Sequence, residues 1–219
     1  MTSKPRDGAR TPRQRELMVA AARLFAQRGY HAVGINDISG ELGLTGPAFY
    51  RHYPSKEALL VAVLDEAITA HLENVIELVR AIRDPSVALR AIVDNHVAFV
   101  LNQTANISTW RTEFRSLPDA DRHRLRYLQR LYTEEWVHTL RQLRPTLTAE
   151  EVRTLCQGAI ALIQSATEFQ TRLDRAVLGQ ILSAMALHVL VGAPVEAGVP
   201  RPDLAAEEHK RTASTVSTT

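Results

Sequence analysis

Residues 34–56 read GINDISGELGLTGPAFYRHYPSK, and this stretch decides the fold. Its first half predicts a short helix over about residues 36–42, because three apolar side chains share one helical face: Ile35, Ile38 and Leu42. Gly43 permits a left-handed turn after that helix, and Thr45 is a suitable N-cap for a second short helix that ends at His52. Two short helices joined by a glycine turn are typical of a helix-turn-helix.

The second of these helices has the composition of a helix that approaches DNA. Its first residues, Gly46, Pro47 and Ala48, add little bulk at the N-terminus, and Phe49 is expected to face the core. Polar side chains that donate hydrogen bonds to phosphates accompany them: Asn36, Tyr50, Arg51, His52 and Lys56. A three-helix bundle with another role is the alternative, because such bundles also contain glycine turns and short capped helices.

A longer helix precedes this stretch. Thr11 and Gln14 form a capping box at its start, and Gly29 ends it. Residues 1–10 are polar and lack periodicity, so we expect a disordered basic arm. Residues 1–60 contain nine Lys and Arg against five Asp and Glu, whereas the remaining residues contain 17 against 19. This asymmetry favours a polyanionic partner at the N-terminal end.

The rest of the chain is helical in pattern, without sustained alternation of period two. Capping residues and prolines predict further helices over about these ranges: 56–83, 86–103, 119–143, 149–171 and 174–191. The tail, residues 192–219, is rich in Pro, Gly, Ser and Thr and is expected to be disordered. The predicted fold class is therefore all-α: a three-helix DNA-binding domain over residues 11–54, joined to a larger helical domain for ligand binding and dimerisation over residues 55–191.

Composition excludes several other classes. The 219 residues are 45% hydrophobic and 23% charged, which is ordinary for a protein with a packed core. The single cysteine, Cys156, excludes an intramolecular disulfide and a multi-cysteine zinc site, and we expect neither a metal nor a cofactor. The apolar runs are shorter than the roughly 18 residues that span a bilayer, and the N-terminus has no apolar signal core. We therefore expect a cytoplasmic protein without a membrane partner.

Residues 43–60, GLTGPAFYRHYPSKEALL, resemble the DNA-binding signature of the TetR/AcrR family of transcriptional regulators. Residues 21–30, AARLFAQRGY, resemble the first helix of that family. The resemblance implies a homodimeric repressor with two recognition helices, Thr45–His52, in successive major grooves of a palindromic operator. It also implies that bases are nearest Gly46, Pro47 and Ala48, and that Tyr50, His52 and Lys56 contact the DNA backbone. Gly34 stands where the family usually has a Thr or Ser cap, so we expect Asn36 or the backbone to replace that contact.

The last two predicted helices carry apolar stripes interspersed with small residues. Such stripes are explained either by packing within the chain or by a homodimer interface, and the resemblance favours an interface with two helices from each chain. The expected interface residues are Leu155, Ala159, Leu162, Ala166, Val177, Ile181, Ala184 and His188.

The middle of the chain combines aromatic side chains with arginines near Pro118. The residues expected to contact a small-molecule effector are Trp110, Arg111, Glu113, Phe114, Arg115, Tyr127, Arg130 and Glu168. The density of arginines favours an anionic ligand with an apolar body, such as a fatty acid or an acyl-CoA. Residues 111–117 loosely resemble the matching segment of family members that sense such ligands. The alternatives are a solvated basic face, or a multidrug-type site in which Glu113 and Glu168 bind cationic or aromatic compounds.

Enzyme motifs are missing from the sequence. It contains no G-x-S-x-G, glycine-rich phosphate loop, dinucleotide fingerprint or H-E-x-x-H. An all-α enzyme with scattered catalytic residues is a distant alternative. The sequence therefore predicts a non-enzymatic regulator with three partners: double-stranded DNA, a second copy of the chain, and a small-molecule effector.

Overall fold

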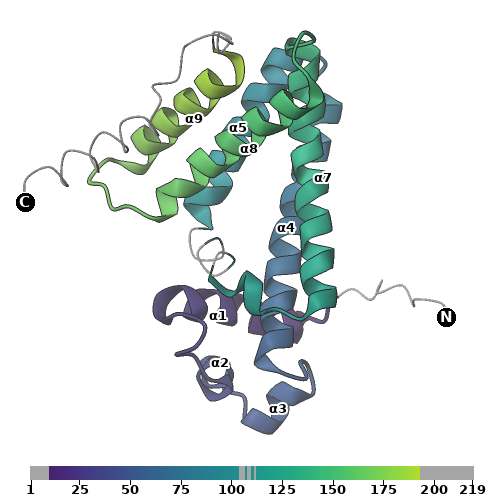
Figure 1. Cartoon of the computed structure of the whole chain (residues 1–219). Coiled ribbons are helices and arrows are strands. Elements are labelled where there is room, and N and C mark those ends of the chain that lie inside the picture. The colour runs from purple at the N-terminus through teal and green to yellow at the C-terminus, as the bar shows by residue number, and fades with distance from the viewer. Residues whose placement is uncertain (1–9, 104–106, 108–109, 111, 193–219) are drawn as a thin grey trace, which may run out of the picture.

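The computed structural model describes residues 10–103, 107, 110 and 112–192. In Figure 1, a small head formed by α1, α2 and α3 lies at one end of two long helices, α4 and α7, which run side by side. Helices α5, α8 and α9 complete the body at the other end. The elements have these bounds: α1 Pro12–Arg28, α2 Ile35–Glu41, α3 Gly46–Tyr50, α4 Lys56–Ala81, α5 Pro85–Asn102, η1 Phe114–Ser116, α7 Asp119–Leu143, α8 Ala149–Gln164, η2 Ser165–Thr167 and α9 Arg175–Val191. The predicted all-α class is confirmed. Most of the predicted arm, the tail from residue 193 and Arg111 lie outside the described residues.

Helix starts follow the capping residues in the sequence. The predicted box at the start of α1 is present, and Ser55 caps α4 by accepting a hydrogen bond from the backbone N–H of Ala58. The predicted end of α8 near residue 171 is wrong, because α8 ends at Gln164 and one 3₁₀ turn follows. There the Thr167 hydroxyl donates to the carbonyl of Gln164, a local bond that competes with continuation of the helix.

The predicted cap of α3 is only half right. Thr45 is the N-cap residue, but its side chain makes no capping hydrogen bond. Pro47 has no backbone N–H to donate, and the N–H of Ala48 already donates to the carbonyl of Thr45 at 3.0 Å. The Thr45 hydroxyl is therefore left exposed on the surface of the head.

Two hydrophobic clusters hold the fold together. The head cluster joins α1, α2 and α3 to the first half of α4, and it also takes in Leu117 and Leu125. The body cluster joins the second half of α4 to α5, α7, α8 and α9. Helix α4 thus contributes to both clusters, so a domain boundary at residue 54 stays a prediction.

Two kinds of feature are missing from the part of the chain that the structure describes. None of its helices has the length and apolar character needed to cross a bilayer. Within the same residues, no three His, Cys, Asp or Glu side chains are grouped as metal ligands would be.

Candidate functional site

The helix-turn-helix geometry depends on one glycine. Gly43, between α2 and α3, has a φ of 62°, in the left-handed region that disfavours other residues. The turn is closed by a 2.8 Å hydrogen bond from the N–H of Leu44 to the carbonyl of Ser39. Ile38 and Phe49 are wholly buried beneath the two helices, as predicted for Phe49. The outer face of α3 is therefore held by an apolar core below it.

Most of the residues predicted to contact DNA lie on the outside of the head. Thr45, Pro47, Tyr50 and Arg51 are exposed, as is Asn36, whereas Gly46 and His52 are half-buried. Asn36 adjoins the start of α3, because a Cβ atom added to Gly46 would lie 3.2 Å from its Oδ1. The side chain of Ala48 is only 6% exposed, so it adds little to the outer face, and a base contact by Ala48 stays a prediction.

Lys56 takes part in a contact that the sequence did not reveal. Its Nζ donates to the backbone carbonyls of Tyr30 and Val33, at 2.8 and 2.7 Å, and lies 4.2 Å from the centre of the Tyr30 ring. The side chain thus fastens the α1–α2 turn to the start of α4. A phosphate contact by Lys56 stays a prediction, and it would use the remaining N–H of the ammonium group.

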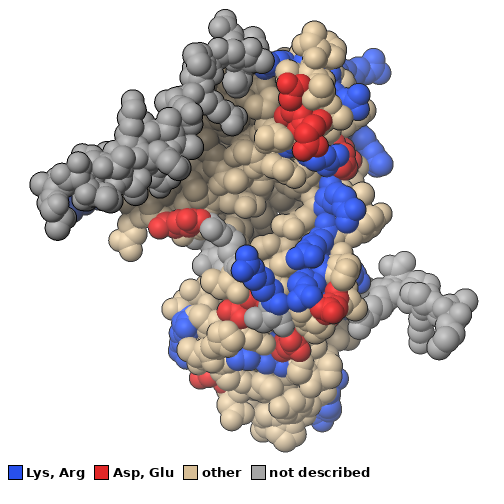
Figure 2. Space-filling model, viewed as in Figure 1, with Lys and Arg blue, Asp and Glu red and all other residues tan. Residues whose placement is uncertain are grey.

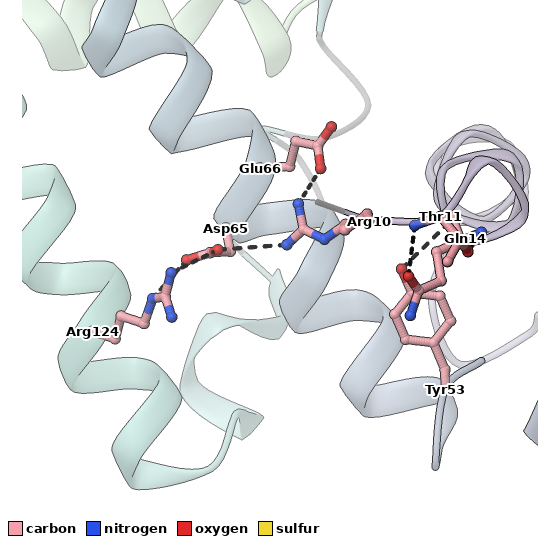
Figure 3. Close-up of polar contacts among 7 residues, drawn as sticks. All are labelled: Arg10, Thr11, Gln14, Tyr53, Asp65, Glu66 and Arg124. Atoms are coloured by element: carbon pink, nitrogen blue, oxygen red, sulfur yellow. Dashed lines mark hydrogen bonds and ion pairs between the residues drawn. The ribbon is translucent and has the colours of Figure 1, made fainter. Parts of the chain in front are cut away.

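Ion pairs join the head to the body (Figure 3). Asp65 of α4 pairs with Arg124 of α7, with Oδ1–Nε 2.9 Å and Oδ2–Nη2 3.0 Å, and Oδ2 also lies 3.6 Å from Arg10 Nη2. Arg10, just before α1, also pairs with Glu66. Arg10 was expected to belong to the disordered arm, but these two carboxylates fix it. The start of α1, α4 and α7 therefore meet at the Asp65 carboxylate.

A cavity of about 330 Å³ lies in the body, between α4, α5, α7 and α8. Its apolar lining comes mainly from Leu64, Ile68, Phe99 and Ile160. Its polar lining includes His71, His96, Gln129, Tyr132, Thr133, Gln157 and Gln164. The mouth carries arginines, since Arg126 and Arg130 of α7 line the cavity and are also exposed to solvent. Figure 2 shows a band of basic side chains along α7 on this face.

The arginines at the mouth differ in how far their charge is compensated. Arg153 Nη1 lies 2.7 Å from Glu134 Oε1 and is thus paired. Arg126 lies 5.4 Å from the centre of the Phe114 ring, and neither Arg126 nor Arg130 forms an ion pair with any residue that the structure describes. Two cationic groups at the mouth are therefore available to an anion.

Only some of the predicted effector residues reach this cavity. Trp110 and Arg130 line it, and Phe114 stacks behind Trp110 with ring centres 4.8 Å apart. The others lie elsewhere: Glu113, Arg115, Tyr127 and Glu168. Tyr127 lies on an outward face of α7, and the buried Glu113 carboxylate lies 3.1 Å from His31 in the head. Proximity in sequence to Pro118 was thus a poor guide to the cavity.

The cavity wall contains a buried polar trio that was not predicted from the sequence: His71 of α4, His96 of α5 and Tyr132 of α7. Burial lowers the pKa of His71 to about 4; burial and the neighbouring His71 lower the pKa of His96 to about 3. Burial raises the pKa of Tyr132. All three side chains are therefore uncharged at neutral pH. The sequence signal that could have indicated this trio is a histidine on an otherwise apolar face of each of two helices, His71 in α4 and His96 in α5.

The predicted dimer residues divide between an exposed face and the core. On α9, Val177 and Ile181 are exposed, and so is Met185 on the same face, although all three are apolar. Ala184 and His188 are exposed beside them, and Leu155, Leu162 and Ala166 are half-buried. Ala159 is wrong as an interface residue, because it is fully buried in the body cluster of its own chain.

The comparisons with known proteins agree with this geometry. Residues 17–63 match the family model described as "Bacterial regulatory proteins, tetR family". The chain is 35% identical over 98 residues to the transcriptional activator FasR of Mycolicibacterium smegmatis, covering 43% of this chain and 45% of FasR. It is 29% identical over 140 residues to the transcriptional repressor KstR2 of Rhodococcus jostii, covering 61% of this chain and 66% of KstR2. The match thus spans about half to two thirds of the length of these relatives.

Solved structures show the same fold. The structure of AibR with isovaleryl coenzyme A and operator DNA superposes with a TM-score of 0.69 at 19% identity, over 79% of this chain and 97% of that one. The structure of FadR from Bacillus subtilis with stearoyl-CoA superposes with a TM-score of 0.67 at 16% identity, over 82% and 99% of the two chains.

Proposed function

We propose that this chain, whose residues 17–63 match the family model of TetR-type bacterial regulatory proteins, is a homodimeric, ligand-responsive transcriptional repressor. Its two recognition helices, α3 of each subunit, bind a palindromic operator, and a small molecule in the body cavity releases them. Both a named activator and a named repressor are among its relatives, so repression is the part of this proposal that a reporter assay must decide.

The observation that carries the proposal is the course of α4. Lys56, at its first residue, fastens the DNA-binding head, and His71, four turns later, lines the cavity. Between them, Asp65 connects α4 to Arg124 of α7 and to Arg10 before α1. A ligand that binds better to one spacing of α4 and α7 therefore favours one orientation of the head, by no more than its differential affinity for the two states.

The apolar face of α9 supports the dimer. Val177, Ile181 and Met185 are each at least 40% exposed, and together they form one stripe of the helix. Ile181→Arg should place a charge in the interface and yield monomers, while Val87→Arg, at an exposed apolar site on α5, should leave the dimer intact. Light scattering distinguishes the two, and a dimeric Ile181→Arg variant would contradict this interface.

The charges around the cavity favour an anionic effector with an apolar body, such as a fatty acid or an acyl-CoA. Arg126 and Arg130 are at the mouth, and no Asp or Glu is among the described residues that line the cavity. A cationic compound would lack a counter-charge there, because Glu113 and Glu168 lie elsewhere. The non-enzymatic role belongs to the same proposal and rests on the regulatory names of the relatives.

The experiment is an operator-binding titration. The protein is first bound to fluorescently labelled DNA from upstream of its own gene, and binding is measured by fluorescence anisotropy. The complex is then titrated separately with an acyl-CoA, a free fatty acid and a cationic dye. We expect specific, salt-sensitive binding and release by the anionic ligands. Arg130→Gln should weaken that release without changing operator affinity in its absence, whereas Arg141→Gln, exposed on α7 away from the cavity, should respond like the wild type. Release by the dye alone would contradict the effector class.

A further inference from the structure

The polar trio is a closed triangle of contacts inside the cavity wall. His71 Nε2 lies 3.1 Å from His96 Nδ1 and 3.1 Å from the Tyr132 hydroxyl oxygen, which lies 3.0 Å from His96 Nδ1. All three side chains are at most 5% exposed, and Phe99 stacks on His71 with ring centres 3.9 Å apart. The trio is thus a built polar site, held by α4, α5 and α7 within an otherwise apolar cluster.

The trio cannot satisfy all its own hydrogen-bond donors. Each neutral imidazole has one N–H and one acceptor nitrogen, and the phenol has one O–H. The two nitrogens inside the triangle are His71 Nε2 and His96 Nδ1. If both carry protons, only the phenol oxygen can accept a hydrogen bond, and the phenol O–H has no acceptor in the trio. In the other tautomers, at least one imidazole proton is on the nitrogen outside the triangle.

For His96 this outside atom is Nε2, which is buried and has no hydrogen-bond partner among the residues that the structure describes. For His71 it is Nδ1, which again lies outside the three contacts. Every combination of tautomers therefore leaves at least one N–H or O–H without an acceptor in the trio. An oxygen atom on a ligand in the cavity can accept from such a donor, and His96 Nε2 has no other partner among the described residues.

The charges of the lining residues determine which part of a ligand lies at the trio and which part lies at the mouth of the cavity. The trio is uncharged at neutral pH, because burial lowers the pKa of both histidines. A carboxylate or phosphate placed there would be desolvated without a counter-charge. Arg126 and Arg130 at the mouth provide that counter-charge, so an anionic group belongs at the mouth and an uncharged oxygen at the trio.

The positions of the polar groups along α7 also indicate a ligand length. Arg126 and Tyr132 are six residues apart on α7, which corresponds to about 9 Å along the helix axis. A chain of about eight carbons spans that distance.

We propose that the cavity selects an organic anion of medium length that carries an uncharged hydroxyl or carbonyl oxygen at its far end. His71, His96 and Tyr132 bind that oxygen, and Arg126 and Arg130 bind the anionic group. This inference rests on the proposed function, since it specifies the effector of the same cavity. A free carboxylic acid and a coenzyme A thioester provide the same chemistry and are separated by the test.

The test is isothermal titration calorimetry of the full chain with octanoate, 8-hydroxyoctanoate, hexadecanoate and the coenzyme A thioesters of all three acids. We expect the hydroxylated member of each C8 pair to bind at least about tenfold more tightly, because a site with unpaired polar groups rejects an analogue that lacks the oxygen. Tyr132→Phe should reduce that preference at least about fivefold. The control is Thr139→Val, which removes a buried hydroxyl from the same helix outside the cavity and should preserve the preference.

Each of the other outcomes overturns a defined part of this inference or of the proposed function. Equal binding of octanoate and 8-hydroxyoctanoate, or tightest binding of hexadecanoate, overturns this inference and leaves the regulator intact. An unchanged preference in Tyr132→Phe overturns the assignment to the trio; if that variant does not fold, His71→Gln replaces it. Absence of binding by all six compounds overturns the effector class of the proposed function as well, although operator binding would still support a DNA-binding regulator.

Discussion

The head and the body of this molecule bury their side chains in different ways. The head cluster is made of apolar side chains from α1 to α4, and it supports the recognition helix from below through Phe49. The body cluster surrounds a cavity of about 330 Å³ and takes two histidines and a tyrosine into its wall. The head is thus filled by apolar side chains, whereas the body contains a cavity whose wall includes hydrogen-bonding groups.

Because of this difference, mutations in the head and mutations at the cavity should impair different functions. Damage to the head should unfold the surface that binds DNA, because a filled core relaxes poorly around a deleted side chain. Damage at the cavity should change the response to an effector at a smaller cost in stability, because the wall already borders empty space.

The largest expected effect compares one truncation in each region. Phe49→Ala should lower the free energy of unfolding by about 3–5 kcal/mol and abolish operator binding, because Phe49 is fully buried below α3. Ile160→Ala, in the half-buried cavity wall, should cost less than about 2 kcal/mol and leave operator binding intact. Urea denaturation and anisotropy measure both. Equal costs would mean that the cavity wall is as tightly packed as the head.

The next effect concerns pH. The pKa values of His71 and His96 are lowered to about 4 and about 3 by burial, against 6.5 in the unfolded chain. Below pH 6.5 the unfolded chain therefore binds protons that the native chain does not, and stability falls with pH. At pH 5 each histidine should have removed about 2 kcal/mol of the unfolding free energy present at pH 7.

His96→Gln should reduce this pH dependence by about half, because it leaves one buried histidine. His138→Gln, at an exposed position on α7, is the control and should leave the dependence unchanged. Urea denaturation at pH 7 and pH 5 gives the difference for each variant. A wild type equally stable at both pH values would show that the histidines are accessible to protons in the native state.

What could be predicted from the sequence follows the same division. In the head, the recognition helix, its buried Phe49 and its glycine turn lie within 23 residues, so local spacing determines their places. For Ala48 the pattern gave the place at the start of the helix but did not reveal that the side chain is almost fully buried. The burial of a single side chain on a five-residue helix depends on the packing of α3 against its neighbours.

In the body, the site is assembled from helices far apart in sequence. His71, His96 and Tyr132 meet only because α4, α5 and α7 pack together, and no local pattern encodes that meeting. Most of the predicted effector residues were chosen near Pro118, and of those that the structure describes, only Trp110 and Arg130 line the cavity. Likewise, the apolar stripe of α8 predicted a partner surface but could not separate Ala159, which faces its own chain, from the half-buried Leu162.

The connection between the two regions gives a smaller effect. Asp65→Asn should weaken the contact of α4 with Arg124 and with Arg10, so the head should follow the body less closely. We expect the ratio of operator affinities without and with effector to fall about fivefold, while operator affinity without effector changes little. Glu77→Gln, exposed further along α4, is the control. An unchanged ratio in Asp65→Asn would show that the signal passes elsewhere.

The smallest effect tests whether the exposed face of the head contacts phosphates or bases. The Tyr50 ring is 56% exposed beside α3, so its hydroxyl is free to donate to a phosphate. Tyr50→Phe should weaken binding to the operator and to random DNA alike, about threefold, which is the loss of one hydrogen bond of less than 1 kcal/mol. The slope of affinity against salt should not change, because a neutral phenol displaces no counterion.

Tyr53→Phe is the control: it removes a hydroxyl that lies inside the head, 3.4 Å from the carbonyl of Gln14, and should leave DNA binding unchanged. Anisotropy titrations at several salt concentrations measure these quantities. A loss confined to the operator would place the Tyr50 hydroxyl on a base edge, and the exposed face of α3 would then read sequence as far as its last residue.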